Sequence, residues 1–219
     1  MNHLFLGAIL AFLLGSIPFG FLIARTKKID IRHQGSGNIG ATNVYRTLGA
    51  GPGLLTLALD FAKGFLTTFV TLKATEFHEV HYGIMVGTCA VIGHMFSPLL
   101  AFKGGRGVAT GLGVVLAATP EAAGIALILW LPLLLLTQYM SLASLVGAWS
   151  IPISAYTFSY GEKVVLLYIL IAILVTLKHS PNIRRLLQGT EHRLRLIPPK
   201  TEKSNSPQKD EQKKPASDS

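Results

Sequence analysis

The chain has 219 residues, of which half are hydrophobic and 14% are charged. Water-soluble domains usually carry about 25% charged residues, so this composition indicates an integral membrane protein. The net charge is +9, but no aromatic residues are interleaved with the basic ones near the C-terminus, which argues against a nucleic-acid partner. Because Cys89 is the single cysteine, a disulfide or a cysteine-based metal site within one chain is excluded.

Apolar stretches of membrane-crossing length recur along the chain and predict an all-α polytopic membrane protein with about seven transmembrane helices. They lie at about 3–24, 54–72, 82–99, 108–118, 121–136, 142–158 and 163–177. The stretch 108–118 is too short and glycine-rich for a full straight crossing, and it predicts a half-crossing or a short helix within the membrane. Pro18, within GSIPFG, predicts a kink or a close helix contact near the inner end of the first helix.

The distribution of lysine and arginine predicts the orientation. Ten of the 20 basic residues lie at or beyond Lys178 and five more between Arg25 and Arg46, whereas the loops on the other side hold only Lys73 and Lys163. Because positive loops stay in the cytoplasm, the N-terminus is expected outside and the C-terminus inside. We expect one transmembrane catalytic domain over 1–197 and a disordered basic and polar cytoplasmic tail over 198–219, which has almost no large apolar residues.

Three polar, glycine-containing stretches then fall on the same, cytoplasmic side. They are 33–53, 101–113 and 179–191. Glycine lets a backbone approach a ligand closely, and hydroxyl, amide and guanidinium groups suit the oxygens of phosphate. The sequence therefore predicts a phosphate-binding site at the inner face of the membrane.

The first polar stretch contains GSGNIG, which matches the G-x-G-x-x-G pattern of dinucleotide-binding proteins. Its context argues against a nucleotide site. Such a site needs a strand before the pattern and a βαβ unit around it, whereas predicted membrane helices flank this stretch. We expect it to wrap an anion with backbone donors, short polar side chains and one bidentate guanidinium. The candidate residues are Ser36, Gly37, Asn38, Gly40, Thr42, Asn43 and Arg46.

The other two stretches supply further candidates. In FKGGRGVATG, the cations Lys103 and Arg106 lie among Gly104, Gly105 and Gly107, just before a helix whose N-terminus would favour an anion. In the third stretch, His179 is a candidate because the unperturbed pKa of histidine lies near working pH. Asn182 would share its face on a helix. Whether His179 is a base or only a binder stays open. Ser141 and Glu191 are additional polar candidates, with Glu191 able to pair with Arg184 or Arg185.

Two charged residues lie inside the second apolar stretch. Asp60 and Lys63 would each cost about 2.5–3.5 kcal/mol at the bilayer centre, and their i, i+3 spacing allows them to pair on one face. That pairing gives a purely structural explanation, and His94 is similarly ambiguous. The histidines and acidic residues show no spacing that is typical of metal ligands, so neither a metal nor another cofactor is expected.

Together, GSIPFG, SGNIGATNVYRTLG, DFAKG, GHMFSP, FKGGRGVATG and HSPNIRRLLQGTE resemble the bacterial acyl-phosphate-dependent glycerol-3-phosphate acyltransferases of the inner membrane. The resemblance covers the chain from the first apolar stretch to about Glu191. It implies transfer of a fatty acyl group from acyl phosphate to the 1-hydroxyl of sn-glycerol 3-phosphate. The products would be lysophosphatidate and phosphate, at the start of phospholipid synthesis.

The resemblance also implies residue roles. Ser36, Arg46, Lys103, His179 and Asn182 match functional residues of the family's motifs, and the glycines around Lys103 match its glycerol-phosphate loop. Ser141 is carried over as a binding residue and Glu191 as a structural one. The implied partners are acyl phosphate, glycerol 3-phosphate and membrane lipids, the implied mechanism needs no protein nucleophile, and the oligomeric state is left open.

The alternative function is a membrane transporter of small organic phosphates. Broken helices with anion-binding N-termini are also typical of transporters. Against this alternative, the polar groups gather at one membrane face and not at the midplane, and the sequence shows no pair of repeats.

Overall fold

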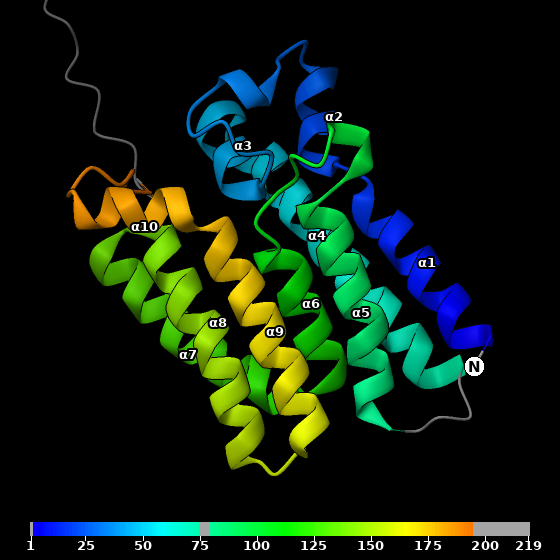
Figure 1. Cartoon of the computed structure of the whole chain (residues 1–219). Coiled ribbons are helices and arrows are strands. Elements are labelled where there is room, and N and C mark those ends of the chain that lie inside the picture. Colours follow the sequence, from blue (N-terminus) through cyan, green and yellow to red (C-terminus); the bar gives the residue numbers. More distant parts are fainter. Residues whose placement is uncertain (1, 75–78, 195–219) are drawn as a thin grey trace, which may run out of the picture.

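The computed structural model describes residues 2–74 and 79–194 of the chain. Every regular element in these two ranges is a helix (Figure 1), as the sequence predicts. The tail predicted over 198–219, and the end of the predicted domain at residue 197, lie outside the described residues.

The helices follow one another with short connections. The α-helices are α1 (Asn2–Ser16), α2 (Phe19–Thr26), α3 (Ala41–Leu48), α4 (Ala50–Ala74), α5 (Val80–Met95), α6 (Val108–Ala118), α7 (Pro120–Thr137), α8 (Met140–Thr157), α9 (Glu162–Lys178) and α10 (Ser180–Leu187). Two short 3-10 helices are η1 (Ile31–His33) and η2 (Pro98–Leu100).

Four segments are long and apolar enough to cross a membrane, judged by length and composition. They are His3–Thr26, Ala50–Ala74, Val80–Leu100 and Pro120–Thr137. A fifth is obtained if α9 and α10, which are bent by 61° relative to each other, form one span. The short helix predicted over 108–118 is confirmed as α6. The total of about seven crossings stays a prediction.

Proline and glycine determine where two of these segments break or begin. The kink predicted near Pro18 is confirmed, since α1 ends at Ser16 and α2 begins at Phe19. The second apolar helix begins at Ala50, earlier than the predicted start after Gly53. Pro52 then lies in the first turn of α4, where a missing backbone N–H costs no helical hydrogen bond.

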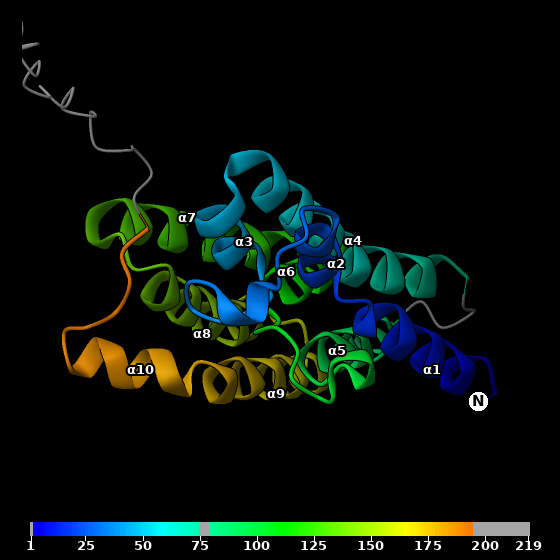
Figure 2. The same ribbon diagram turned by 90° about the horizontal axis from the view of Figure 1, so that it is seen from above.

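The long helices lie side by side, and their contacts arrange them around α6 (Figures 1 and 2). The main pairs are α1 with α5, α4 with α6, α7 with α8, and α8 with α9. The backbones of α4 and α6 cross closely at Gly64, where an added Cβ would lie 1.9 Å from the Thr110 carbonyl oxygen. Outward-facing apolar side chains such as Ile128, Leu131 and Leu136 of α7 are exposed, as a lipid-facing surface requires.

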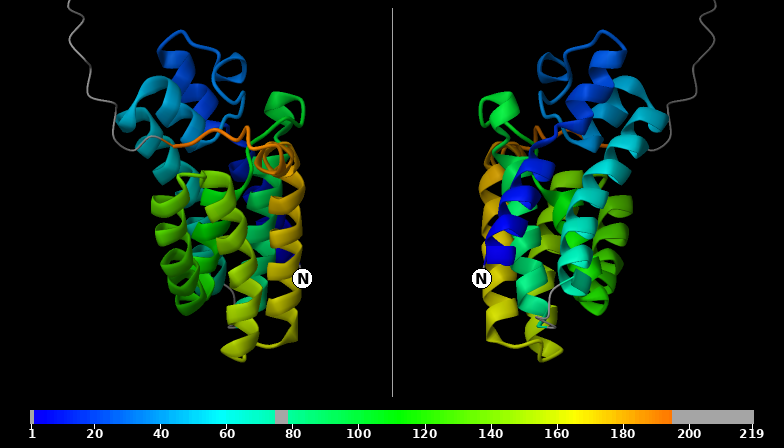
Figure 3. Two further views of the ribbon diagram at one scale, coloured as in Figure 1. Left: turned by 90° about the vertical axis from the view of Figure 1, so that its left-hand side faces the viewer. Right: turned by 90° about the vertical axis from the view of Figure 1, so that its right-hand side faces the viewer.

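The short helices and the loops next to them gather at one end of the long helices (Figures 1 and 3). This end holds α2, α3, η2 and α10, and the start of α1 lies toward the opposite end. The three polar stretches singled out in the sequence, although distant along the chain, therefore meet in space.

Candidate active site

The loop before α3 is held in shape by the side chain of Asn43. The Asn43 Oδ1 atom accepts a hydrogen bond from the Ser36 N–H at 2.9 Å. Its Nδ2 donates to the carbonyl oxygens of Gln34 at 2.9 Å and Asn38 at 2.8 Å. Because its amide hydrogens are used in this way, Asn43 shapes the loop in this structure. The Ser36 hydroxyl makes no hydrogen bond within the described residues.

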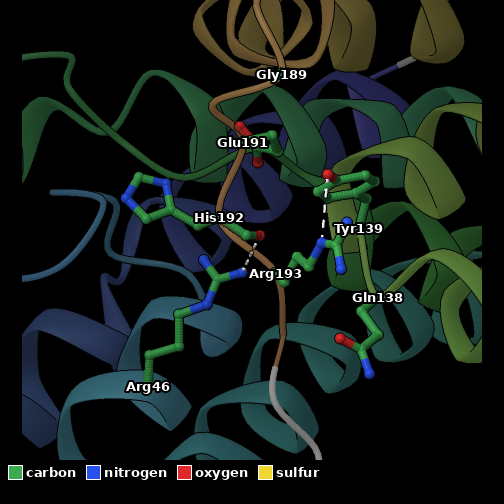
Figure 4. Close-up of a pocket in the computed structure, with 7 residues that line it drawn as sticks. All are labelled: Arg46, Gln138, Tyr139, Gly189, Glu191, His192 and Arg193. Carbon is green, nitrogen blue, oxygen red and sulfur yellow. Dashed lines mark hydrogen bonds between the residues drawn. The ribbon is translucent and has the colours of Figure 1, made fainter.

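Arg46, in the last turn of α3, reaches the segment that follows α10. Its Nη2 donates to the His192 carbonyl oxygen at 2.9 Å, joining positions 146 residues apart (Figure 4). Its Nε is buried and has no hydrogen-bond partner in the described part of the chain. Desolvation by burial lowers the pKa of this guanidinium. A donor without a partner is thus available to a ligand.

Arg106 is the cation of the second stretch that lines the cavity described below. Its guanidinium has no hydrogen bond or ion pair with any residue in 2–74 or 79–194. Burial lowers its pKa to about 10, with the carboxylate of Glu191 opposing the shift and Arg185 and Arg46 adding to it. The group therefore remains charged at neutral pH, and no carboxylate of the described residues forms an ion pair with it.

Lys103, predicted as the central cation of that loop, is exposed and does not line the cavity. The neighbouring backbone is tied to the end of α5, since the Gly104 N–H donates to the Met95 carbonyl and the Gly105 N–H to the His94 carbonyl. The structure thus places Arg106, and not Lys103, next to the loop of Ser36.

His179 follows the last residue of α9, and its side chain is 1% exposed. Its Nδ1 lies 2.8 Å from the Val175 carbonyl oxygen. A carbonyl can only accept, so Nδ1 carries the proton and Nε2 keeps a free lone pair when the ring is neutral. Burial, followed by repulsion from Arg106, lowers the pKa of His179 to about 4. The ring is therefore neutral at physiological pH.

The carboxylate of Glu191 accepts hydrogen bonds from three side chains, one on α8 and two in the third polar stretch. Its Oε1 accepts from the Ser141 hydroxyl at 3.0 Å and from Asn182 Nδ2 at 2.6 Å, and its Oε2 accepts from Arg185 Nε at 2.8 Å. Burial opposes ionisation, but these hydrogen bonds outweigh it and lower the pKa of the carboxyl group. The predicted pairing of Glu191 with an arginine is confirmed, with Arg185 as the partner.

This arrangement determines what Ser141 and Asn182 contact. Ser141 was predicted to bind substrate and Asn182 to act in catalysis, and in the structure both donate hydrogen bonds to Glu191. The Asn182 Oδ1 atom is buried without a partner among the described residues, so one acceptor remains uncommitted. An open polar hollow of about 520 Å³ lies beside this network (Figure 4). Its lining residues are Arg46, Gln138, Tyr139, Gly189, Glu191, His192 and Arg193.

A cavity of about 460 Å³ connects the polar end of the molecule with the space between the helices. Nine of the predicted site residues line it, namely Ser36, Asn38, Gly40, Thr42, Asn43, Arg46, Arg106, Gly107 and His179. The predicted residues Gly37, Lys103, Gly104, Gly105, Ser141 and Asn182 do not. Its deeper wall is largely apolar and includes Leu57, Leu112, Val115, Leu127, Trp130 and Leu134.

Sequence reasoning did not assign several of these lining residues to the site. The apolar lining residues could not be recognised from the sequence, because they do not differ from other apolar residues of membrane helices. Asp60 and His94 also line the cavity, and their only signal was their cost inside an apolar helix. Within the two described ranges, no group of three or more His, Cys, Asp or Glu side chains could hold a metal ion.

Comparisons with known proteins place the chain in a family. The family model described as glycerol-3-phosphate acyltransferase matches residues 5–189. The glycerol-3-phosphate acyltransferase of Aquifex aeolicus is 43% identical over 88% of this chain and 100% of its own length. That of Geobacter sulfurreducens is 43% identical over 89% of this chain and 99% of its own length.

Two solved structures show the same architecture. Crystal structures of PlsY, an integral membrane glycerol 3-phosphate acyltransferase, match with TM-scores of 0.84 for its glycerol 3-phosphate form and 0.81 for its lysophosphatidic acid form. Each is 41% identical in sequence and covers 87% of this chain and 95% of the other. The family model covers the first two polar stretches and the third as far as residue 189, and the chain belongs to the glycerol-3-phosphate acyltransferase family.

Proposed function

We propose that this protein transfers a fatty acyl group from acyl phosphate to the 1-hydroxyl of sn-glycerol 3-phosphate, releasing lysophosphatidate and phosphate. One observation carries the proposal: a single cavity joins two arginines and a neutral histidine at its polar end to an apolar wall between the helices. Acyl phosphate has the same division, with a phosphate at one end of a hydrocarbon chain. The tail is expected to lie against the apolar wall with its phosphate at the polar end, next to Arg46.

The chemistry requires positioning more than activation. The glycerol hydroxyl oxygen attacks the acyl carbon, an ester C–O bond forms, and the bond between the acyl carbon and the phosphate oxygen breaks with its electron pair leaving on phosphate. No protein nucleophile is required, because the hydroxyl attacks the acyl carbon directly, and its proton moves to the departing phosphate. Holding two anionic substrates in line and stabilising the developing negative charge would supply the catalysis.

Individual roles follow from the geometry. Arg106 is proposed to hold the phosphate of glycerol 3-phosphate and the free Nε of Arg46 that of the acyl donor, with the Ser36 hydroxyl and the loop N–H groups as further donors. Lys103 is proposed to add positive charge from the same loop as Arg106. The lone pair of His179 Nε2 and the free Oδ1 of Asn182 are proposed to orient the two hydroxyls of glycerol 3-phosphate, each accepting a hydrogen bond from a different one.

We also propose that the enzyme is a multi-pass protein of the bacterial inner membrane, with about seven crossings, the N-terminus outside and the active site facing the cytoplasm. The excess of lysine and arginine on one side supports this orientation. So does the meeting of the three polar stretches at one end of the long helices (Figure 3).

The test uses the full-length protein purified in detergent. Palmitoyl phosphate and glycerol 3-phosphate are expected to give lysophosphatidate and phosphate in equal amounts. Palmitoyl-CoA in place of palmitoyl phosphate is expected to give neither. Product formed from palmitoyl-CoA alone would overturn the proposed donor. A folded protein that acylates glycerol 3-phosphate with neither palmitoyl phosphate nor palmitoyl-CoA would overturn the function.

A further inference from the structure

Three ionisable side chains form a buried cluster between α4 and α5, at the edge of the cavity. Asp60, Lys63 and His94 are 2%, 2% and 5% exposed. Lys63 Nζ lies 2.8 Å from Asp60 Oδ1 and 3.4 Å from His94 Nδ1, and His94 Nδ1 lies 3.6 Å from Asp60 Oδ1. A buried ion pair stabilises a fold no better than well-packed apolar residues, because desolvation offsets the attraction. The cluster therefore calls for a role other than stability alone.

On one side, the cluster fastens the break between α1 and α2. Lys63 Nζ donates to the carbonyl oxygens of Ile17 at 2.6 Å and Gly15 at 3.2 Å, on either side of Ser16. It also lies 4.9 Å from the centre of the Phe19 ring. Since Pro18 interrupts the helix here, Lys63 holds backbone that the helix itself does not.

On the other side, the cluster supports the loop that carries Arg106. The His94 carbonyl accepts the Gly105 N–H at 3.0 Å, and the Met95 carbonyl accepts the Gly104 N–H at 3.2 Å. The His94 ring lies directly against Gly105, since a Cβ added there would be 2.1 Å from Nε2. The next residue is Arg106, whose guanidinium lines the cavity without a hydrogen-bond or ion-pair partner among the described residues. A continuous set of contacts thus runs from Asp60 and Lys63 through the imidazole to this loop.

We propose that Asp60, Lys63 and His94 are positioning residues that hold the 103–107 loop where Arg106 meets the phosphate of glycerol 3-phosphate. This inference rests on the proposed function, since it assigns that phosphate to Arg106. Fixed loop geometry is needed because a phosphate is held by several donors at once, and a displaced loop loses them together. The acyl donor's chain contacts other walls of the cavity.

The first test measures binding of glycerol 3-phosphate by calorimetry and its KM with palmitoyl phosphate, using the full-length protein in detergent. Lys63→Met and His94→Ala are each expected to raise Kd and KM for glycerol 3-phosphate about tenfold, with kcat changed much less. Thr88→Val is the matched control, because it removes a buried side-chain hydrogen bond from α5 away from the loop. Its Kd and KM should stay unchanged at a similar loss of melting temperature.

The second test is a double-mutant cycle between His94 and Gly105. Gly105→Ala places a Cβ whose three nearest neighbours are atoms of the His94 ring and should weaken binding, whereas His94→Ala removes those atoms. The double variant is therefore expected to bind better than the product of the two single effects predicts. Effects that multiply independently would overturn the proposal. So would cluster variants that lower melting temperature and kcat while leaving Kd and KM for glycerol 3-phosphate at the wild-type values.

Binding and turnover separate this inference from the proposed function. A wild-type protein that binds glycerol 3-phosphate without using acyl phosphate would refute the proposed donor, and the Kd values of the variants would still decide the role of the cluster. A folded wild-type protein that does not bind glycerol 3-phosphate would overturn both. If His94→Ala does not fold, Lys63→Met and Gly105→Ala, compared with Thr88→Val, make the same measurement.

Discussion

Replacing Arg106 by glutamine is expected to remove most of the activity without destabilising the protein. In the structure this guanidinium has no hydrogen bond or ion pair with any described residue, although burial is sufficient to lower its pKa to about 10. A cation held in this way stabilises nothing in the free protein, and its removal even relieves a desolvation cost. Its contribution is expected only when an anion is bound.

The expected size follows from the bond that would be lost. A hydrogen bond to a charged group contributes about 1.5–3 kcal/mol. At 1.4 kcal/mol per factor of ten, kcat/KM for glycerol 3-phosphate should fall by about 10- to 150-fold in Arg106→Gln. The melting temperature should be equal to or above that of the wild type.

The assay is lysophosphatidate formation from palmitoyl phosphate at varied glycerol 3-phosphate, with thermal unfolding of the same preparations. Arg184→Gln is the matched control, because Arg184 is an exposed arginine on α10 that does not line the cavity. It should keep the wild-type kcat/KM. A folded Arg106→Gln protein within twofold of the wild type would refute the reasoning, as would an equal loss in Arg184→Gln.

Further predictions concern the second and third polar stretches. Lys103→Ala should abolish phosphate release from acyl phosphate plus glycerol 3-phosphate, and unchanged turnover in a folded variant would remove Lys103 from the site. The folded-state pKa of His179 is about 4, below its ordinary 6.5, so an unfolded chain takes up a proton that the buried ring does not. The contribution of the neutral His179 ring to the free energy of unfolding should therefore be fully present above pH 6.5 and be lost between about pH 6.5 and 4. Thermal unfolding of His179→Gln should lack this part of the pH dependence. Glu191→Gln removes the ion pair with Arg185 and should lower the free energy of unfolding by about 1–3 kcal/mol, measured by denaturation in detergent. An unchanged melting temperature would show that the segment after α10 is held by other contacts.

The sequence by itself determined the class of protein and the polar stretches that form the site. Low charge and long apolar runs are properties of composition, and they predict membrane helices wherever the chain is placed. The break at Pro18 and the short helix α6 were equally local, because proline and segment length act within a few residues. The family motifs lie in the same stretches, so the likeness to known acyltransferases also needed no structure.

Tertiary structure alone decided which side chains of those stretches share the cavity. Lys103 and Arg106 are equivalent in the sequence, but the loop ties to α5 turn Arg106 inward and leave Lys103 exposed. The partners of Glu191 and the contact between Arg46 and the His192 carbonyl join residues far apart along the chain, which no local pattern specifies. A side chain's direction and its loss of water depend on how helices cross, and these are properties of the packed molecule.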